Sequence, residues 1–293
     1  MGCHHVHDRF EYPPPASGGA RVPGPGVIMA VSLKNSPYQF RSLRVKLLGG
    51  FYLWRDSEPV QASHNAQRLV AFVALNSPTP RDFVAGRLWP NVEERHAKGS
   101  LRTCIWQLQR TCPGILRSEG ENLLLGGMVR VDAMDLKCRA LQILQDPSSA
   151  VFSDLSCELA GDELLPGWYD EWVLAERERS RLLRLHALEA AAREFLEQDR
   201  AGAAMQVALA AALIEPLRES CHRLIISIHL AEGNGAEAVR HYLAWRSLLR
   251  RELGIAPSNQ ITNLLQGVLA TDAACDEPGW IVSLHNLVLK ERR

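Results

Sequence analysis

Residues 95–112 read RHAKGSLRTCIWQLQRTC, and this stretch decides how the rest of the chain is interpreted. At about 100° per residue its apolar side chains share one face of a helix; they are Ala97, Leu101, Cys104, Ile105, Leu108 and Cys112. The opposite arc contains no carboxylate and consists of Arg95, His96, Gly99, Arg102, Thr103, Trp106, Gln107 and Arg110. A solvated helix normally carries charges of both signs. The arc therefore predicts an anionic partner and a DNA recognition helix, with an ordinary basic surface helix as the alternative.

The segments around this helix follow the order of a winged helix. Short strands are predicted at residues 44–48, 51–54 and 60–61, helices at 65–75 and 81–88, and the strands of a hairpin at 115–117 and 123–131. In the second helix we expect Phe83, Val84 and Leu88 to face inward. In a winged helix the third helix lies in the major groove of DNA, and the hairpin, or wing, contacts the backbone or the minor groove.

From residue 135 onward the strand patterns disappear and the chain is predicted to be almost wholly helical. The expected helices are at 136–144, 171 to about 198, 202–214, 218–231, 236–253 and 259–270. Two similar turns, at 199–203 and 232–236, lie 33 residues apart, and helical hairpins with a period near 34 are typical of tetratricopeptide repeats. A plain helical bundle is the alternative. We interpret the charged face at Glu176, Arg177, Glu178, Arg179, Arg181 and Arg184 as solvated.

The two halves of the chain differ in net charge, although the net charge of the whole chain is zero. Residues 41–140 carry 15 Lys and Arg against 9 Asp and Glu, whereas residues 141–293 carry 15 against 22. Such an asymmetry indicates that one half faces nucleic acid. Arginine outnumbers lysine 28 to 5, which favours bidentate contacts to phosphate and guanine, although a GC-rich genome produces the same bias.

Cysteine usage and hydropathy indicate a cytoplasmic protein with no membrane partner. The seven cysteines are scattered and form no C-x-x-C pair, so we interpret them as reduced thiols. No apolar run approaches the length of about 18 residues that a membrane span requires, and the N-terminus has no secretory pattern. Residues 1–40 are rich in proline and glycine and are expected to be a disordered extension.

Several phrases of the sequence resemble the SARP-type (antibiotic regulatory protein) bacterial transcriptional activators. The matching phrases are Leu88-Trp89-Pro90, Ser100-Leu101-Arg102, the stretches LPGWYDEW at 165–172 and EPLRE at 215–219, and RELGIAPS at 251–258. The resemblance implies an α+β N-terminal winged helix, OmpR-like, at 41–133. It implies an all-α tetratricopeptide-like helical repeat domain, the bacterial transcriptional activation domain, at 134–272. Residues 273–293 remain as a C-terminal tail outside the resemblance, and their role stays open.

The same resemblance implies a sequence-specific, DNA-binding transcriptional regulator. It would bind repeats in double-stranded DNA near promoters, recruit RNA polymerase as an activator and act as a homodimer on DNA. The resemblance leads us to expect arginine in many relatives at the positions of Gln107 and Gln109, so the target sequence is expected to differ. The alternative function is a tetratricopeptide-like interaction scaffold whose winged helix binds protein rather than DNA.

The candidate DNA-binding residues are Arg95, His96, Lys98, Arg102, Thr103, Gln107, Arg110, Arg117 and Asn122. Arg102 and Arg110 can reach guanine edges or phosphates, and Gln107 can pair with adenine. Lys98 lies nearer the buried edge and suits phosphate. Trp106 either packs under the hairpin or lies against the DNA backbone. Arg117, Asn122 and Arg130 are candidate contacts of the wing, and only contacts to base edges specify sequence.

No catalytic, metal or cofactor site is predicted. The sequence contains no G-x-x-x-x-G-K-[ST], H-E-x-x-H or G-x-S-x-G pattern. His186, His222, His229 and His241 lie in predicted helices without a carboxylate or cysteine at ligand spacing, and we interpret them as packed or surface residues. The protein is therefore expected not to be an enzyme.

Overall fold

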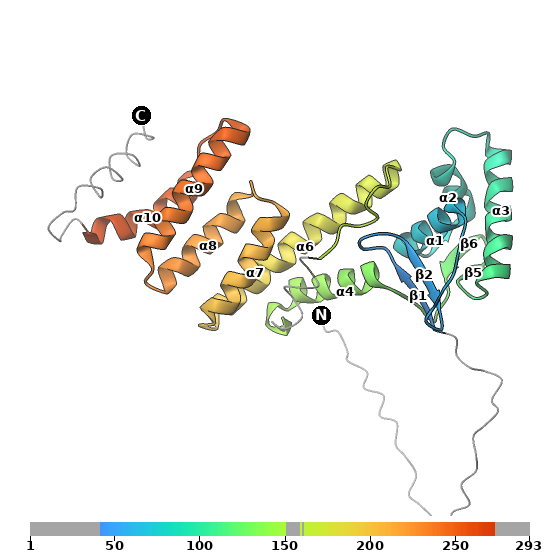
Figure 1. The fold of residues 1–293 in the computed structure, drawn as a ribbon, viewed down its shortest axis with the longest axis horizontal. Helices are drawn as coiled ribbons and strands as arrows, with labels where there is room; N and C mark the ends of the chain where they lie inside the picture. Colours follow the sequence, from blue (N-terminus) through green and yellow to red (C-terminus); the bar gives the residue numbers. More distant parts are fainter. Residues whose placement is uncertain (1–41, 151–158, 160, 273–293) are drawn as a thin grey trace, which may run out of the picture. The chain divides into compact units, whose positions relative to one another are not determined.

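The computed structural model describes residues 42–150, 159 and 161–272 (Figure 1). The expectations of a disordered segment at 1–40 and a tail at 273–293 lie outside these residues. Across the described part of the chain, an N-terminal region of small sheets and helices is followed by a region made almost entirely of helices. No helix in the described part combines the length and the apolar character that crossing a membrane requires.

Two small sheets flank the N-terminal helices. The first has the order β3-β2-β1-β7, from Glu58–Pro59, Tyr52–Arg55, Leu43–Lys46 and Val129–Val131. The second has the order β4-β6-β5, from Thr79–Pro80, Asn122–Leu125 and Leu116–Glu119. β7 runs parallel to β1, whereas β6 and β5 form the antiparallel hairpin.

The prediction of one strand at 123–131 is therefore wrong, because this stretch contributes β6 and β7 to different sheets. The break falls at Gly126, whose N–H donates to the Ile115 carbonyl at 2.9 Å. A Cβ atom at this position would lie 1.9 Å from the Gly114 carbonyl oxygen. The backbones therefore approach as only glycine allows, and the chain leaves the hairpin to pair with β1.

Three helices, α1 (His64–Asn76), α2 (Arg81–Leu88) and α3 (Glu94–Thr111), build the N-terminal core. The expectation that Phe83 faces inward is wrong, since half of this residue is exposed. α2 is only two turns long and buries Val84, Ala85 and Leu88, which places Phe83 at the edge of its buried face. There its ring lies 6.2 Å from that of Phe72.

The second half is an array of antiparallel helices (Figure 1). In chain order they are α4 (Asp132–Gln145), the 3-10 turn η1 (Pro147–Ser149), α6 (Glu171–Glu197), α7 (Ala201–Ile214), α8 (Glu219–Ala231), α9 (Gly235–Leu253) and α10 (Asn259–Asp272). Ser258 caps α10, because its hydroxyl accepts from the Gln260 N–H at 3.2 Å.

The two turns that suggested a repeat have the same backbone structure. Asp199 and Gly233 both have positive φ, of 59° and 76°. At the first turn the Arg200 N–H donates to the Phe195 carbonyl, and at the second the Asn234 N–H donates to the His229 carbonyl. Both are the six-to-one bond that closes a helix in a Schellman motif. α6–α7 and α8–α9 are thus equivalent helical hairpins, as the tetratricopeptide-like interpretation predicted.

The prediction of a solvated face on α6 is wrong for Arg177 and Arg184. Arg184 is only 6% exposed and donates to the carbonyls of Leu159, Gly161 and Asp162. Arg177 donates to the carbonyls of Leu164, Leu165 and Trp168. The segment before α6 is irregular, so its carbonyl groups need donors from outside a helix or sheet. The two arginines supply those donors.

The same segment is bonded to the first sheet and completes the N-terminal core. Leu165 N–H donates to the Leu47 carbonyl, and Gly49 N–H donates to the Glu163 carbonyl, both at 2.8 Å. Four residues of the segment and of α6 are buried with the winged-helix residues; they are Leu164, Leu165, Trp172 and Val173. The Trp172 ring meets Phe72 of α1 edge to face, with ring centroids 5.1 Å apart. The N-terminal core therefore extends well past residue 133.

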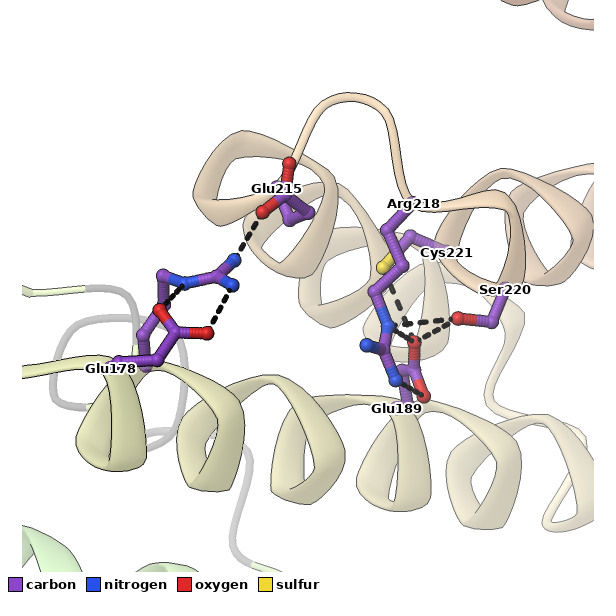
Figure 2. A network of polar contacts seen from close by, with 7 residues as sticks. Glu178, Glu189, Glu215, Arg218, Ser220 and Cys221 are labelled. Atoms are coloured by element: carbon purple, nitrogen blue, oxygen red, sulfur yellow. Dashed lines mark hydrogen bonds and ion pairs between the residues drawn. The ribbon is translucent and has the colours of Figure 1, made fainter. Parts of the chain in front are cut away.

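A polar network joins α6 to the start of α8 (Figure 2). The Glu189 carboxylate, buried in α6, accepts from Arg218 Nε at 2.8 Å and from the hydroxyl of Ser220. Burial alone would raise the pKa of Glu189, but these hydrogen bonds outweigh it and hold that pKa below its ordinary value. Burial and the neighbouring Glu189 raise the pKa of the Cys221 thiol to about 12. The network is thus a structural clamp between hairpins rather than a reactive site.

Two histidines form a second buried pair, between α8 and α9. His222 Nδ1 lies 3.0 Å from His241 Nε2, and His222 Nε2 lies 2.8 Å from the Pro216 carbonyl oxygen. The His222 ring stacks on Trp245 with centroids 4.9 Å apart. Burial lowers the pKa of both imidazoles, that of His241 to about 4 with help from His222 and His229. Both histidines are therefore neutral in the folded chain near pH 7.

Replacing Trp172 with alanine should lower the free energy of unfolding by about 3–5 kcal/mol, because it opens a cavity in the N-terminal core. Tyr169→Ala, at a site 80% exposed, is the matched control and should change stability by less than about 0.5 kcal/mol. Denaturant unfolding followed by far-UV circular dichroism measures both. Equal midpoints for the two variants would contradict the placement of Trp172 in the core.

The chain should lose stability as the pH falls from about 6.5 to about 4. The unfolded chain binds protons at its histidines near pH 6.5, whereas folded His241 stays neutral until about pH 4. The unfolded state therefore binds more protons in this window and is favoured by on the order of 2 kcal/mol. Denaturant unfolding at pH 7.5, 6 and 5 tests this. His241→Asn should flatten the decline and His186→Asn, at an exposed position, should not; parallel declines in all three proteins would contradict the assignment.

Candidate nucleic-acid interface

α3 is anchored in the core by the face that its periodicity predicted. Ala97, Leu101, Cys104, Ile105 and Leu108 are all buried, none more than 8% exposed. Cys112 follows the helix and is also buried. Core packing therefore fixes the rotation of α3 about its axis, and the arc opposite this face points to solvent.

Most of the predicted contact residues share that exposed arc. Those that are exposed on α3 are Arg95, His96, Arg102, Thr103, Gln107 and Arg110. The Thr103 hydroxyl donates to the Gly99 carbonyl at 3.1 Å, so this hydroxyl is not free to donate to DNA. A Cβ atom at Gly99 would meet nothing within 4 Å, so the surface there is open.

The carboxylates near α3 gather at its first turn. Lys98 Nζ lies 2.7 Å from Glu94 and 3.0 Å from Asp82, and these hydrogen bonds raise the pKa of Lys98. His96 Nδ1 lies 3.4 Å from a carboxylate oxygen of Glu93. Lys98 is half-buried and held between two acids, which makes it a weaker candidate for phosphate than the sequence suggested.

The positive charge farther along α3 is not neutralised. Within residues 42–150 and 161–272, no ion pair involves Arg102 or Arg110. The middle and the C-terminal half of the arc thus present arginine, glutamine and threonine without a carboxylate, over about three helical turns. A surface with this charge attracts an anion.

Trp106 lies on the same arc, so the expectation that it packs under the hairpin is wrong. Its side chain is 56% exposed, while its neighbour Ile105 is buried. Successive helical residues are about 100° apart, so burial of Ile105 turns Trp106 outward. The Arg110 guanidinium lies 4.7 Å from the centre of the Trp106 ring.

The hairpin is less basic than a wing that binds phosphate would be. Arg117 in β5 pairs with Glu119 at 2.9 Å, and the turn also carries Glu121. Asn122 is half-buried at the start of β6, opposite Glu119. Arg130, expected in the hairpin, lies instead in β7 beside β1, because the chain has left the hairpin at Gly126.

Two residues of the arc were not among the candidates drawn from the sequence. Gln109 is exposed and lies about 60° from Trp106 around the helix. Trp106 itself was considered only as packing or as a backbone contact. The helical angle that selected Arg102 and Arg110 also selects these two, so the signal was present in the spacing. Among the described residues, no group of three or more His, Cys, Asp and Glu is arranged to hold a metal.

Comparison with known proteins concerns both halves of the chain. Residues 138–269 match the family described as bacterial transcriptional activator domain. The regulatory protein AfsR of Streptomyces coelicolor is 28% identical over 251 residues, which cover 80% of this chain and 25% of AfsR. AfsR of Streptomyces griseus is 26% identical over 257 residues, covering 81% of this chain and 26% of that protein. The chain thus spans about a quarter of the length of these relatives.

A solved structure supports the fold. Mycobacterium tuberculosis EmbR, in complex with a low affinity phosphopeptide, superposes with a TM-score of 0.60 at 18% sequence identity. The match covers 85% of this chain and 70% of EmbR. It therefore includes both the winged helix and the helical repeats that follow it.

Proposed function

We propose that the chain is a transcriptional regulator of the SARP type, as its match to the bacterial transcriptional activator domain and its similarity to AfsR indicate. We propose further that it binds specific sequences of double-stranded DNA through the exposed arc of α3. The observation that carries the proposal is the arc itself. Its opposite face is buried in the core, and Arg102 and Arg110 extend from it without a carboxylate partner among the described residues.

We assign some residues of the arc to phosphate contacts, which position the protein on DNA, and others to base edges, which determine the sequence. Arg95 and His96, at the N-terminal end, suit phosphate oxygens, since contacts there set the position of the protein on the duplex. Arg102 and Arg110 suit guanine edges, and Gln107 suits adenine. Thr103 presents its methyl group, because its hydroxyl is bonded to Gly99. In this assignment Lys98 serves mainly to fasten α2 to α3 through Asp82.

The helical repeats supply the second part of the function. We assign recruitment of RNA polymerase and the pairing of two copies on repeated DNA sites to the region of α4 and α6–α10. The match of residues 138–269 to the bacterial transcriptional activator domain supports this role. Stacked helical hairpins present an extended surface to a protein partner. The acidic excess of residues 141–293 argues against a second DNA-binding surface there.

The full chain should bind sequences selected from a randomised duplex library, and its dissociation constant should rise at least about tenfold between 50 and 200 mM salt. Arg102→Ala should weaken binding by about 1–3 kcal/mol without changing the melting curve. Leu101→Ala is the matched control on the buried face and should instead cost about 2–5 kcal/mol of stability. Electrophoretic mobility shift and circular dichroism measure the two effects. Binding that is insensitive to salt and to Arg102 would favour the protein scaffold over DNA binding.

The hairpin should oppose DNA binding rather than assist it. If its tip lies near phosphates, Glu121→Lys removes a repulsion and adds an attraction, so affinity should rise severalfold for all sequences alike and the salt dependence should steepen by about one ion. Arg130→Glu, on the other sheet, is the control and should have a smaller effect. Affinities measured at three salt concentrations decide the question; equal slopes for wild type and Glu121→Lys would place the hairpin away from DNA.

A further inference from the structure

Trp106 is the largest apolar side chain on the exposed arc of α3. It lies one turn after Arg102 and one turn before Arg110, in the middle of the surface assigned to DNA. More than half of it is exposed, and the group that lies over its ring is the side chain of Arg110 on the same arc. Aromatic rings are among the side chains that gain most from burial at an interface. An indole in this place therefore points to an apolar group on the partner.

Arg110 is held against this ring. Its guanidinium lies 4.7 Å from the ring centre, which is the geometry of a cation–π contact. A guanidinium carries five N–H donors, and a cation–π contact with a ring face uses none of them in a conventional hydrogen bond. The contact thus limits the directions in which Arg110 extends, while its bidentate edge stays available for a planar pair of acceptors.

We propose that Trp106 and Arg110 act together to read one thymine–guanine step in the major groove. Trp106 contacts the C5-methyl group of the thymine, and Arg110 donates two hydrogen bonds to N7 and O6 of the adjacent guanine. The inference rests on the proposed binding of DNA by α3 and names the sequence element that two of its residues recognise.

The chemistry of the groove supports this assignment. The thymine methyl is the apolar group that the base pairs present in the major groove, and guanine presents two acceptors that match an arginine edge. The separation also fits, because neighbouring bases lie about 3.4 Å apart along the helix axis and the two side-chain groups lie 4.7 Å apart. A phosphate offers no apolar surface to an indole ring. The pair therefore suits adjacent bases better than the backbone.

The inference is tested with the full chain on the duplex that it selects from a randomised library. Each thymine is replaced in turn by deoxyuridine, which lacks only the methyl group, and each guanine by 7-deazaguanine, which lacks N7. Replacing one particular thymine by deoxyuridine should reduce the affinity about fourfold, which is the factor expected for the loss of one buried carbon. Replacing the guanine next to this thymine by 7-deazaguanine should reduce the affinity about tenfold.

Three variants assign the effect to the pair. Trp106→Gln should fold like the wild type and lose the dependence on the thymine methyl, whereas Trp106→Phe should keep most of it. Tyr169→Ala removes an exposed aromatic ring outside α3 and should change nothing. Arg110→Ala should lose the dependence on the adjacent guanine.

Three results would overturn the inference. In the first, Trp106→Gln keeps the full methyl dependence. In the second, the losses spread evenly over all substituted positions, as a backbone contact would produce. In the third, the wild type enriches no sequence at all, which contradicts the proposed DNA binding as well. The first two leave DNA binding intact, so failure of the inference is distinct from failure of the proposed function.

Discussion

The packing between the two halves of the structure depends on the irregular segment before α6, because the backbone carbonyl groups of this segment need hydrogen-bond donors. Its carbonyl groups belong to no helix, and Arg177 and Arg184 of α6 supply most of the donors they receive. An unpaired buried carbonyl costs free energy comparable to a lost hydrogen bond. Bonded in this way, the segment can lie beside β1 and place Leu164 and Leu165 in the N-terminal core. The start of α6 and the N-terminal fold therefore share one core.

That shared core bears directly on the position of α3. Arg68 of α1 is ion-paired with Asp170, just before α6, and also donates to the Leu88 carbonyl at the end of α2 at 2.8 Å. One guanidinium thus joins the residue before α6 to the C-terminal end of α2, the helix that precedes α3. Charge-assisted hydrogen bonds of this kind are directional. Movement of the residues at the start of α6 would therefore displace the Arg68 side chain and, through it, the end of α2. The end of α2, and with it the start of α3, is thus tied to residues from both halves of the chain.

Periodicity predicted well those elements whose two faces differ in polarity. The buried face of α3 follows from apolar spacing, the bounds of α2 follow from the prolines at 80 and 90 on either side of it, and the repeat of α6–α7 and α8–α9 follows from matching turns. Spacing failed where a charged residue is buried by its hydrogen bonds, as at Arg184, since side-chain character alone predicts exposure. It failed at 123–131 because the partner of β7 is β1, more than 80 residues earlier, and pairing partners are not local. Spacing did place Trp106 on the exposed arc, but an indole also suits a core, and this led to the wrong expectation that it packs under the hairpin.

The distribution of charge around α3 indicates how binding and specificity are divided. Acidic side chains lie at the first turn of α3 and at the tip of the hairpin; they are Glu93, Glu94, Glu119 and Glu121. Their negative charge weakens the non-specific attraction of the arc to phosphate on both sides. What remains unpaired is a short row centred on Arg102, Trp106 and Arg110. A surface that attracts the backbone weakly must gain its affinity from base edges, where each matched bidentate contact discriminates by about 1–3 kcal/mol. Under the proposed function, such a surface would bind its own site well and other DNA poorly, which is the property that a regulator of particular promoters requires.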